Sequence, residues 1–139
     1  GYKQIDKATD EILEKIIFTA PQTNNFNFEK VSKRTHLDIA SVNSACSLIQ
    51  TEDGVIQEIH ISAGGVFAFP KYLQNTSDFL VGKKINAENL KTAVEIMNAE
   101  IAPISDARGT AGYKRLLLRQ LFLAHFIKET GPVKKLIGL

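Results

Sequence analysis

Cysteine is nearly missing from this sequence, since Cys46 is the single one among 139 residues. One cysteine cannot form an internal disulfide or supply a cysteine-based metal site. Long apolar runs are missing too: the most apolar stretch, residues 116–127, is interrupted by Arg119, Gln120 and His125, whereas a membrane-spanning helix needs roughly 18 to 20 apolar residues. We therefore expect a cytoplasmic protein with no membrane contact.

Excess charge of one sign is also absent, because 17 basic residues face 15 acidic ones and the net charge is +2. Nucleic-acid binding requires a concentrated basic face, so we expect no nucleic-acid partner. The three histidines, His36, His60 and His125, lie far apart without the spacing of metal ligands. No nucleophile, base and orienting residue converge in the sequence either. The sequence thus predicts no metal site and no catalytic residue, and His125 is expected to be a core or interface histidine.

The residues that are present suit one globular domain. A hydrophobic fraction of 44% is sufficient for a core, and the length fits a single domain. The apolar residues within 10–18 predict a strand, or a short turn leading into one. Residues 21–27 (PQTNNFN) form a polar break and are the best candidate for an internal boundary. Residues 28–33 are expected to be extended.

The strongest local pattern is a β-hairpin. Residues 39–50 are rich in small and β-branched types, residues 52–54 (Glu-Asp-Gly) signal a turn, and residues 55–63 alternate between apolar and polar side chains. Gly64 and Gly65 follow the second strand. They lack the third glycine of a dinucleotide-binding fingerprint, so we interpret them as a bulge or a close backbone approach at a strand end.

The second half of the chain has a helical period. A short helix is expected over residues 72–81. Asn86 is placed to cap a second helix, whose apolar residues fall on one stripe: Leu90, Val94, Met97 and Ile101. A longer helix is predicted from Thr110 to about Lys128, ended by Gly131 and Pro132. Strands first and helices afterwards indicate an α+β fold.

Two polar segments remain open to interpretation. Residues 30–38 hold the cations Lys30, Lys33 and Arg34, which suit either a solvated edge or contact with an anionic ligand or a redox cofactor. Residues 105–109 lie between two predicted helices. There, Asp106 or Ser105 is placed to cap the following turn, and Arg108 is placed to pair with Asp106, so a structural corner is the default interpretation.

Four sets of segments occur in a fixed order: residues 1–3 with 10–13, residues 30–43 (KVSKRTHLDIASVN), residues 61–70 (ISAGGVFAFP) with 79–83, and residues 103–115 (PISDARGTAGYKR). In this order they resemble one family, the C-terminal domain of the FAD-binding subunit of molybdenum hydroxylases. The resemblance implies a three-stranded antiparallel sheet packed against a layer of about three helices. It also implies that residues 1–24 are the tail of an upstream FAD-binding domain with its linker, and that residues 25–139 form the domain itself.

The resemblance implies a function as well. In xanthine dehydrogenase-like complexes, electrons pass from a molybdopterin centre through two [2Fe–2S] clusters to FAD, and then to NAD or another acceptor. The expected partners are the upstream FAD-binding domain and the iron–sulfur and molybdopterin-binding subunits. Most FAD contacts come from the upstream domain, so this domain would cover one side of the flavin and would not be catalytic alone.

Three residues match family positions near the cofactor. Lys30 matches a lysine that contacts FAD, Leu13 a leucine that packs against the flavin, and Arg34 an arginine that can tune the local charge. Some relatives carry a second arginine where this chain has Thr35. The alternative is an interaction module without flavin contact, whose basic strand and apolar last helix dock partner proteins.

Overall fold

The computed structural model describes residue 1, residues 4–18 and residues 25–127. Four strands come first and three helices follow. In chain order these elements are β1 (Phe26–Val31), β2 (Val42–Gln50), β3 (Ile56–Gly64), β4 (Lys71–Tyr72), α1 (Gln74–Leu80), α2 (Ala87–Glu100) and α3 (Ala111–Ala124).

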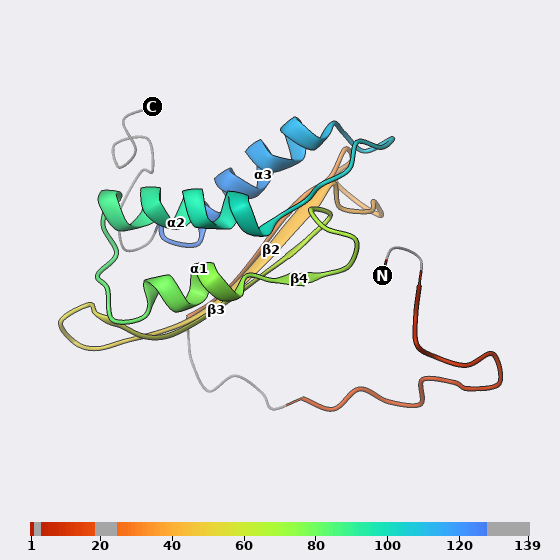
Figure 1. Ribbon diagram of the computed structural model, residues 1–139, viewed down its shortest axis with the longest axis horizontal. Helices are drawn as coiled ribbons and strands as arrows, with labels where there is room; N and C mark the ends of the chain where they lie inside the picture. Colours follow the sequence, from red (N-terminus) through yellow and green to blue (C-terminus); the bar gives the residue numbers. More distant parts are fainter. Residues whose placement is uncertain (2–3, 19–24, 128–139) are drawn as a thin grey trace.

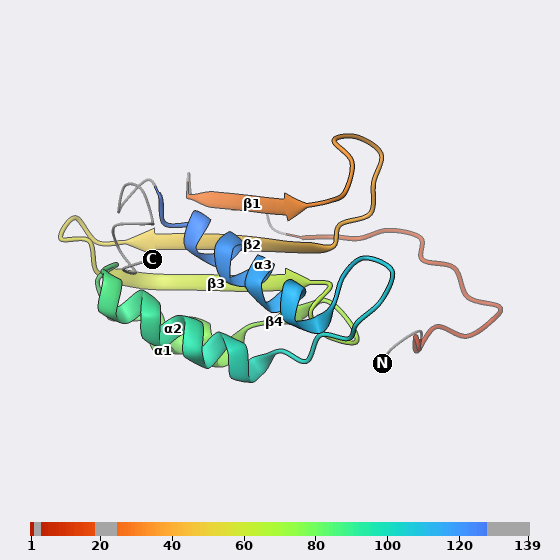
Figure 2. The same ribbon diagram turned by 90° about the horizontal axis from the view of Figure 1, so that it is seen from above.

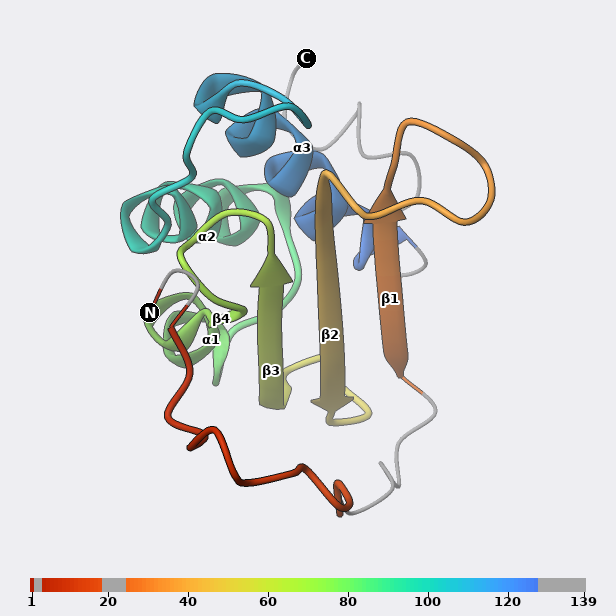
Figure 3. The same cartoon turned by 90° about the vertical axis from the view of Figure 1, so that its right-hand side faces the viewer.

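The strands form one antiparallel sheet in the order β1-β2-β3-β4 (Figure 3). The predicted hairpin is confirmed as β2 and β3. At its turn, the Gly54 N–H donates to the Thr51 carbonyl at 2.9 Å, and Gly54 has a φ of 78°, which glycine adopts without a steric penalty. The fourth strand, β4, was not predicted. It has two residues and includes Tyr72, so the first helix begins later than expected, at Gln74.

All three helices pack on the same face of the sheet (Figure 1). Seen from above, α3 lies over β2, whereas α1 and α2 lie on the β3–β4 side (Figure 2). Every second residue of β2 is buried, from Val42 to Leu48, because strand side chains alternate between the two faces. The largest fully buried side chains lie between the layers and include Ile56, Ile61, Leu90, Met97, Leu118, Phe122 and Phe126. The α+β prediction is confirmed.

The two long helices begin where the sequence predicts. The Asn86 side chain accepts a hydrogen bond from the Asn89 N–H at 2.9 Å, and Thr110 accepts one from the Tyr113 N–H at 3.1 Å. Such caps satisfy backbone donors that have no partner inside the helix. The helix α3 runs to Ala124, and a turn at residues 125–126 separates it from Ile127, which is again helical. The predicted end at about Lys128, and the glycine and proline expected to end the helix, lie outside the described residues.

The strand predicted over residues 10–18 is wrong. Residues 11–18 have no regular secondary structure, and their large apolar side chains are 74–86% exposed, namely Ile12, Leu13, Ile16, Ile17 and Phe18. The apolar pattern is real, but within the described residues no strand pairs with this segment. Figure 1 places the segment on the side of the sheet opposite to the helices.

Candidate functional site

Three loops gather at one end of the sheet (Figure 3). Because the strands are antiparallel, β1 and β3 end where β2 begins. The loop of residues 32–41 therefore lies close to the loop of residues 65–70 and to residues 101–110. Three hydrogen bonds join these loops: Lys33 Nζ to the Ala107 carbonyl at 2.7 Å, Ser41 Oγ to the Arg108 carbonyl at 3.3 Å, and the Ala102 N–H to the Val66 carbonyl at 3.0 Å.

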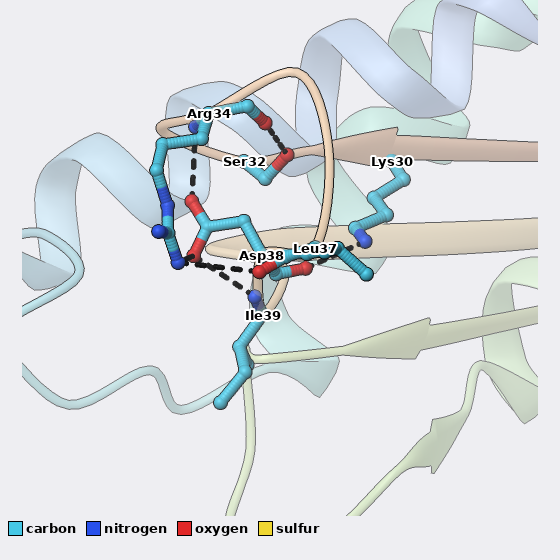
Figure 4. A network of polar contacts seen from close by, with 6 residues as sticks. All are labelled: Lys30, Ser32, Arg34, Leu37, Asp38 and Ile39. Atoms are coloured by element: carbon cyan, nitrogen blue, oxygen red, sulfur yellow. Dashed lines mark hydrogen bonds and ion pairs between the residues drawn. The ribbon is translucent and has the colours of Figure 1, made fainter.

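Asp38 organises the loop that follows β1 (Figure 4). Its carboxylate accepts hydrogen bonds from the N–H groups of Arg34 at 2.9 Å and Ile39 at 3.0 Å, and it pairs with the Arg34 guanidinium at 3.5 Å. Its carbonyl accepts a hydrogen bond from Lys30 Nζ at 2.7 Å. The Arg34 N–H, more than any other group, holds the pKa of Asp38 below its usual value. The ionised carboxylate of Asp38 thus holds the Arg34 side chain, whereas the backbone carbonyl of Asp38 holds Lys30.

The structure brings together two of the three residues predicted to bind the cofactor. Lys30 and Arg34 both donate to Asp38. Leu13 is not part of this network: it lies in the separate segment of residues 11–18 and is 74% exposed. A shared site for all three residues is therefore not formed within the described residues.

Two apolar side chains of the same loop were missed by sequence reasoning. Leu37 is 98% exposed and Ile39 is 67% exposed, and Leu37 has a φ of +49°, which is uncommon outside glycine. They flank Asp38, so exposed apolar surface lies next to the two cations. The available signal was the pair of large apolar residues in an otherwise polar loop.

The segment of residues 105–109 is a structural corner, as predicted, but with a different ion pair. Asp106 pairs with Lys114 Nζ at 2.7 Å, and Lys114, whose side chain is 3% exposed, also donates to the Ile104 carbonyl at 2.9 Å. The predicted side-chain pair with Arg108 is wrong, because Arg108 binds Asp106 through its backbone N–H at 2.8 Å. The hydrogen bond from Lys114 is the main reason that the pKa of Asp106 is lowered.

His125 has a structural role. His125 is buried, its Nδ1 lies 3.0 Å from Asn27 Nδ2 and its Nε2 lies 2.9 Å from Ser44 Oγ. Because the Asn27 amide nitrogen can only donate, we assign His125 Nδ1 as the acceptor and Nε2 as the protonated atom. Burial lowers the pKa of His125 to about 4, against a smaller opposing effect of Glu29. Among the described residues, no three His, Cys, Asp or Glu side chains form a potential metal site.

The chain is similar in sequence and in fold to several proteins. The chain is 26% identical to xanthine dehydrogenase 1 of Arabidopsis thaliana over 91% of its own length and 10% of that protein. It is 30% identical to the glyceraldehyde dehydrogenase medium chain of Sulfolobus acidocaldarius over 71% of its length and 34% of that chain. The solved structure of quinoline 2-oxidoreductase from Pseudomonas putida 86 superposes with a TM-score of 0.66 at 26% identity, covering 75% of this chain and 36% of that one.

The fold and these similarities define the C-terminal domain of a flavoprotein. Residues 28–130 match the sequence profile of the CO dehydrogenase flavoprotein C-terminal domain. The chain belongs to this family, which is the C-terminal domain of the FAD-binding subunit of molybdenum hydroxylases. The chain spans about a tenth of the length of the xanthine dehydrogenase and about a third of the length of the glyceraldehyde dehydrogenase medium chain. None of the described helices is long and apolar enough to cross a membrane.

Proposed function

We propose that this chain forms one wall of the flavin site in the FAD-binding subunit of a xanthine dehydrogenase-like molybdenum hydroxylase. Residues 25–139 would form the wall, and residues 1–24 would be the tail and linker of an upstream FAD-binding domain. The bound flavin supplies electron transfer from iron–sulfur clusters to NAD or another acceptor. Molybdopterin and [2Fe–2S] would reside in partner subunits or domains, and the complex would be cytoplasmic.

The observation that carries this proposal is the Asp38 network with its exposed apolar neighbours. The pairing of Asp38 with Lys30 and Arg34 holds two cationic groups at one place. Leu37 and Ile39 add exposed apolar side chains beside them. A flavin dinucleotide has an apolar ring with polar edges and an anionic pyrophosphate, so this combination of donors and apolar surface suits it.

Each residue would have a distinct role. Lys30 would donate a charge-assisted hydrogen bond to a flavin or pyrophosphate oxygen, using ammonium hydrogens that are free to turn away from the Asp38 carbonyl. Arg34 would act through its positive charge, which favours the more negative reduced flavin and is partly offset by Asp38. Leu13 would pack against the ring once the upstream domain is in place.

The test replaces Lys30 in the full-length FAD-binding subunit. A charge-assisted hydrogen bond contributes about 1.5–3 kcal/mol, so Lys30→Ala should weaken FAD binding about 10- to 100-fold or shift the flavin reduction potential. Lys91→Ala is the matched control, because Lys91 is an exposed lysine on α2 in the helical layer. Equal flavin content and equal potential in the two variants would refute a contact at Lys30.

A further inference from the structure

Lys114 is a buried lysine in the first turn of α3. Its side chain is only 3% exposed, and a buried ammonium group needs partners to replace its lost hydration. Its Nζ donates to a carboxylate oxygen of Asp106 at 2.7 Å and to the Ile104 carbonyl at 2.9 Å. Both acceptors belong to the segment that leads into α3, so Lys114 ties the helix to the residues just before it.

Asp106 begins a tight turn of residues 106–109, which we call the corner turn. The Asp106 N–H donates to the Gly109 carbonyl at 3.0 Å, and the Gly109 N–H donates to the Asp106 carbonyl at 3.1 Å. The second carboxylate oxygen of Asp106 accepts a hydrogen bond from the Arg108 N–H at 2.8 Å. The carboxylate of Asp106 therefore joins the buried lysine to the backbone at the tip of the corner turn.

The tip of the corner turn contacts the loop of residues 32–41. The Ala107 carbonyl accepts a hydrogen bond from Lys33 Nζ at 2.7 Å, and the Arg108 carbonyl accepts one from Ser41 Oγ at 3.3 Å. The loop is longer than the about two to five residues that usually connect two paired antiparallel strands. We therefore expect it to need contacts with other parts of the chain to keep one path.

The path of this loop decides how two cations are held. The Arg34 guanidinium donates to the Leu37 carbonyl at 3.2 Å, and Lys30 Nζ donates to the Asp38 carbonyl at 2.7 Å. Both acceptors are backbone atoms of the loop. A change in the path of the loop would therefore move the partners of both cations.

We propose that Lys114 is a positioning residue. Acting through the corner turn, it holds the loop of residues 32–41 in the path that brings the two cations, Lys30 and Arg34, together. The positioning of the loop depends on the contacts within this chain. Its consequence for a flavin rests on the proposed function.

The alternative is that Lys114 only stabilises the fold, and its neighbour Arg115 separates the two roles. Arg115 also donates two hydrogen bonds to backbone carbonyls, to Asn98 at 2.7 Å and to Ile101 at 3.0 Å. These acceptors lie at the end of α2 and not in the corner turn. Removing the Arg115 side chain therefore weakens the helical layer and leaves the contacts between Lys114 and the corner turn in place.

The test measures hydrogen–deuterium exchange in the full-length FAD-binding subunit, by mass spectrometry of peptides. Lys114→Met removes the ammonium group and keeps an unbranched apolar side chain, and Arg115→Met is the matched control. We expect residues 33–41 to exchange about tenfold faster in Lys114→Met, as for the loss of about one hydrogen bond that holds the loop. Residues 56–64 in β3 should exchange at the wild-type rate, and Arg115→Met should leave the loop unchanged.

An acceleration shared with residues 56–64, or equal in the two variants, would overturn the proposal, because it would reflect a general loss of stability. An unchanged loop would overturn it as well. If Lys114→Met does not fold, Asp106→Ala breaks the same link at a side chain that is 33% exposed. The loop should then exchange faster in Asp106→Ala, and a wild-type rate would overturn the proposal.

A double variant tests the route through the corner turn. Lys33→Met removes a contact at the loop end of the link, so it should also accelerate exchange of residues 33–41. If Lys114 acts through the corner turn, the double variant should exchange no faster than Lys114→Met alone, because the two changes break one link. Accelerations that multiply would overturn the route.

The flavin reduction potential separates this inference from the proposed function. If the loop loosens in Lys114→Met, but neither this variant nor Lys30→Ala changes flavin content or potential, the positioning role stands and the flavin site is wrong. If Lys30→Ala weakens FAD binding while the loop of Lys114→Met exchanges at the wild-type rate, the flavin site stands and the positioning role is wrong.

Discussion

The buried His125 makes the stability of this domain depend on pH between about 6.5 and 4. Unfolded, a histidine titrates near 6.5, and in the folded chain burial lowers the pKa of His125 to about 4. The folded state therefore favours the neutral imidazole, which accepts from Asn27 and donates to Ser44. Its contribution to stability is complete above pH 6.5 and is lost as the pH falls towards 4.

The size of the effect follows from the two pKa values. Each pH unit between folded and unfolded pKa corresponds to about 1.4 kcal/mol, so the full loss is about 3 kcal/mol by linkage. Between pH 7 and pH 5 the same two values give a loss of about 2 kcal/mol. Asp38 and Asp106 also have lowered pKa values. Their contribution to stability is lost at a lower pH, as the pH approaches their own pKa values in the folded state.

The assay is urea unfolding at pH 7 and pH 5, with His125→Gln as the comparison. Glutamine retains hydrogen-bonding capacity but cannot become charged, and His36 and His60 are present in both proteins. From pH 7 to pH 5, the free energy of unfolding should fall by about 2 kcal/mol more in the wild type than in His125→Gln. Parallel losses would refute the assignment of His125 as a buried neutral histidine.

Two further substitutions test how the fold holds its loops and helices. A Cβ at Gly65 would lie 2.4 Å from the Ser41 carbonyl oxygen at a φ of +83°, whereas Gly54 has a similar φ with open space around it. In thermal unfolding, Gly65→Ala should therefore lose more stability than Gly54→Ala, for which a loss of about 1 kcal/mol is expected. Equal losses of stability would contradict the clash. Glu100 accepts hydrogen bonds from two backbone N–H groups at the start of α1. Urea unfolding of Glu100→Ala should therefore show a stability loss of about 1–2 kcal/mol, as for loss of a helix cap. A loss no larger than that of the exposed Glu95→Ala would argue against this cap.

Features set by neighbouring residues were predicted well from the sequence. The hairpin was identified from Asp53 and Gly54 between two apolar runs, and the first residues of the two long helices were identified from Asn86 and Thr110. Both succeed because turn and cap geometry depends on a few adjacent residues. The strand over residues 10–18 was predicted wrongly for the opposite reason. An apolar run indicates that a segment needs a partner, but it does not say which chain segment provides one.

The candidate site was only partly accessible from the sequence. The convergence of Lys30 and Arg34 on Asp38 depends on the path of the loop, including the left-handed backbone at Leu37, and no local pattern specifies that path. The buried Lys114 left a readable signal. It lies four residues before Leu118 and seven before Leu121, both buried, so helical spacing places it on the core face, where a lysine needs a partner.

The central claim is that this chain supplies one wall of a flavin site that it cannot complete alone. The most direct measurement is a titration with FAD, followed by flavin fluorescence, of the 139-residue chain and of the full-length subunit. The account predicts tight, stoichiometric binding to the full-length subunit and no tight binding to the chain by itself. A tight one-to-one complex between FAD and these 139 residues would contradict it.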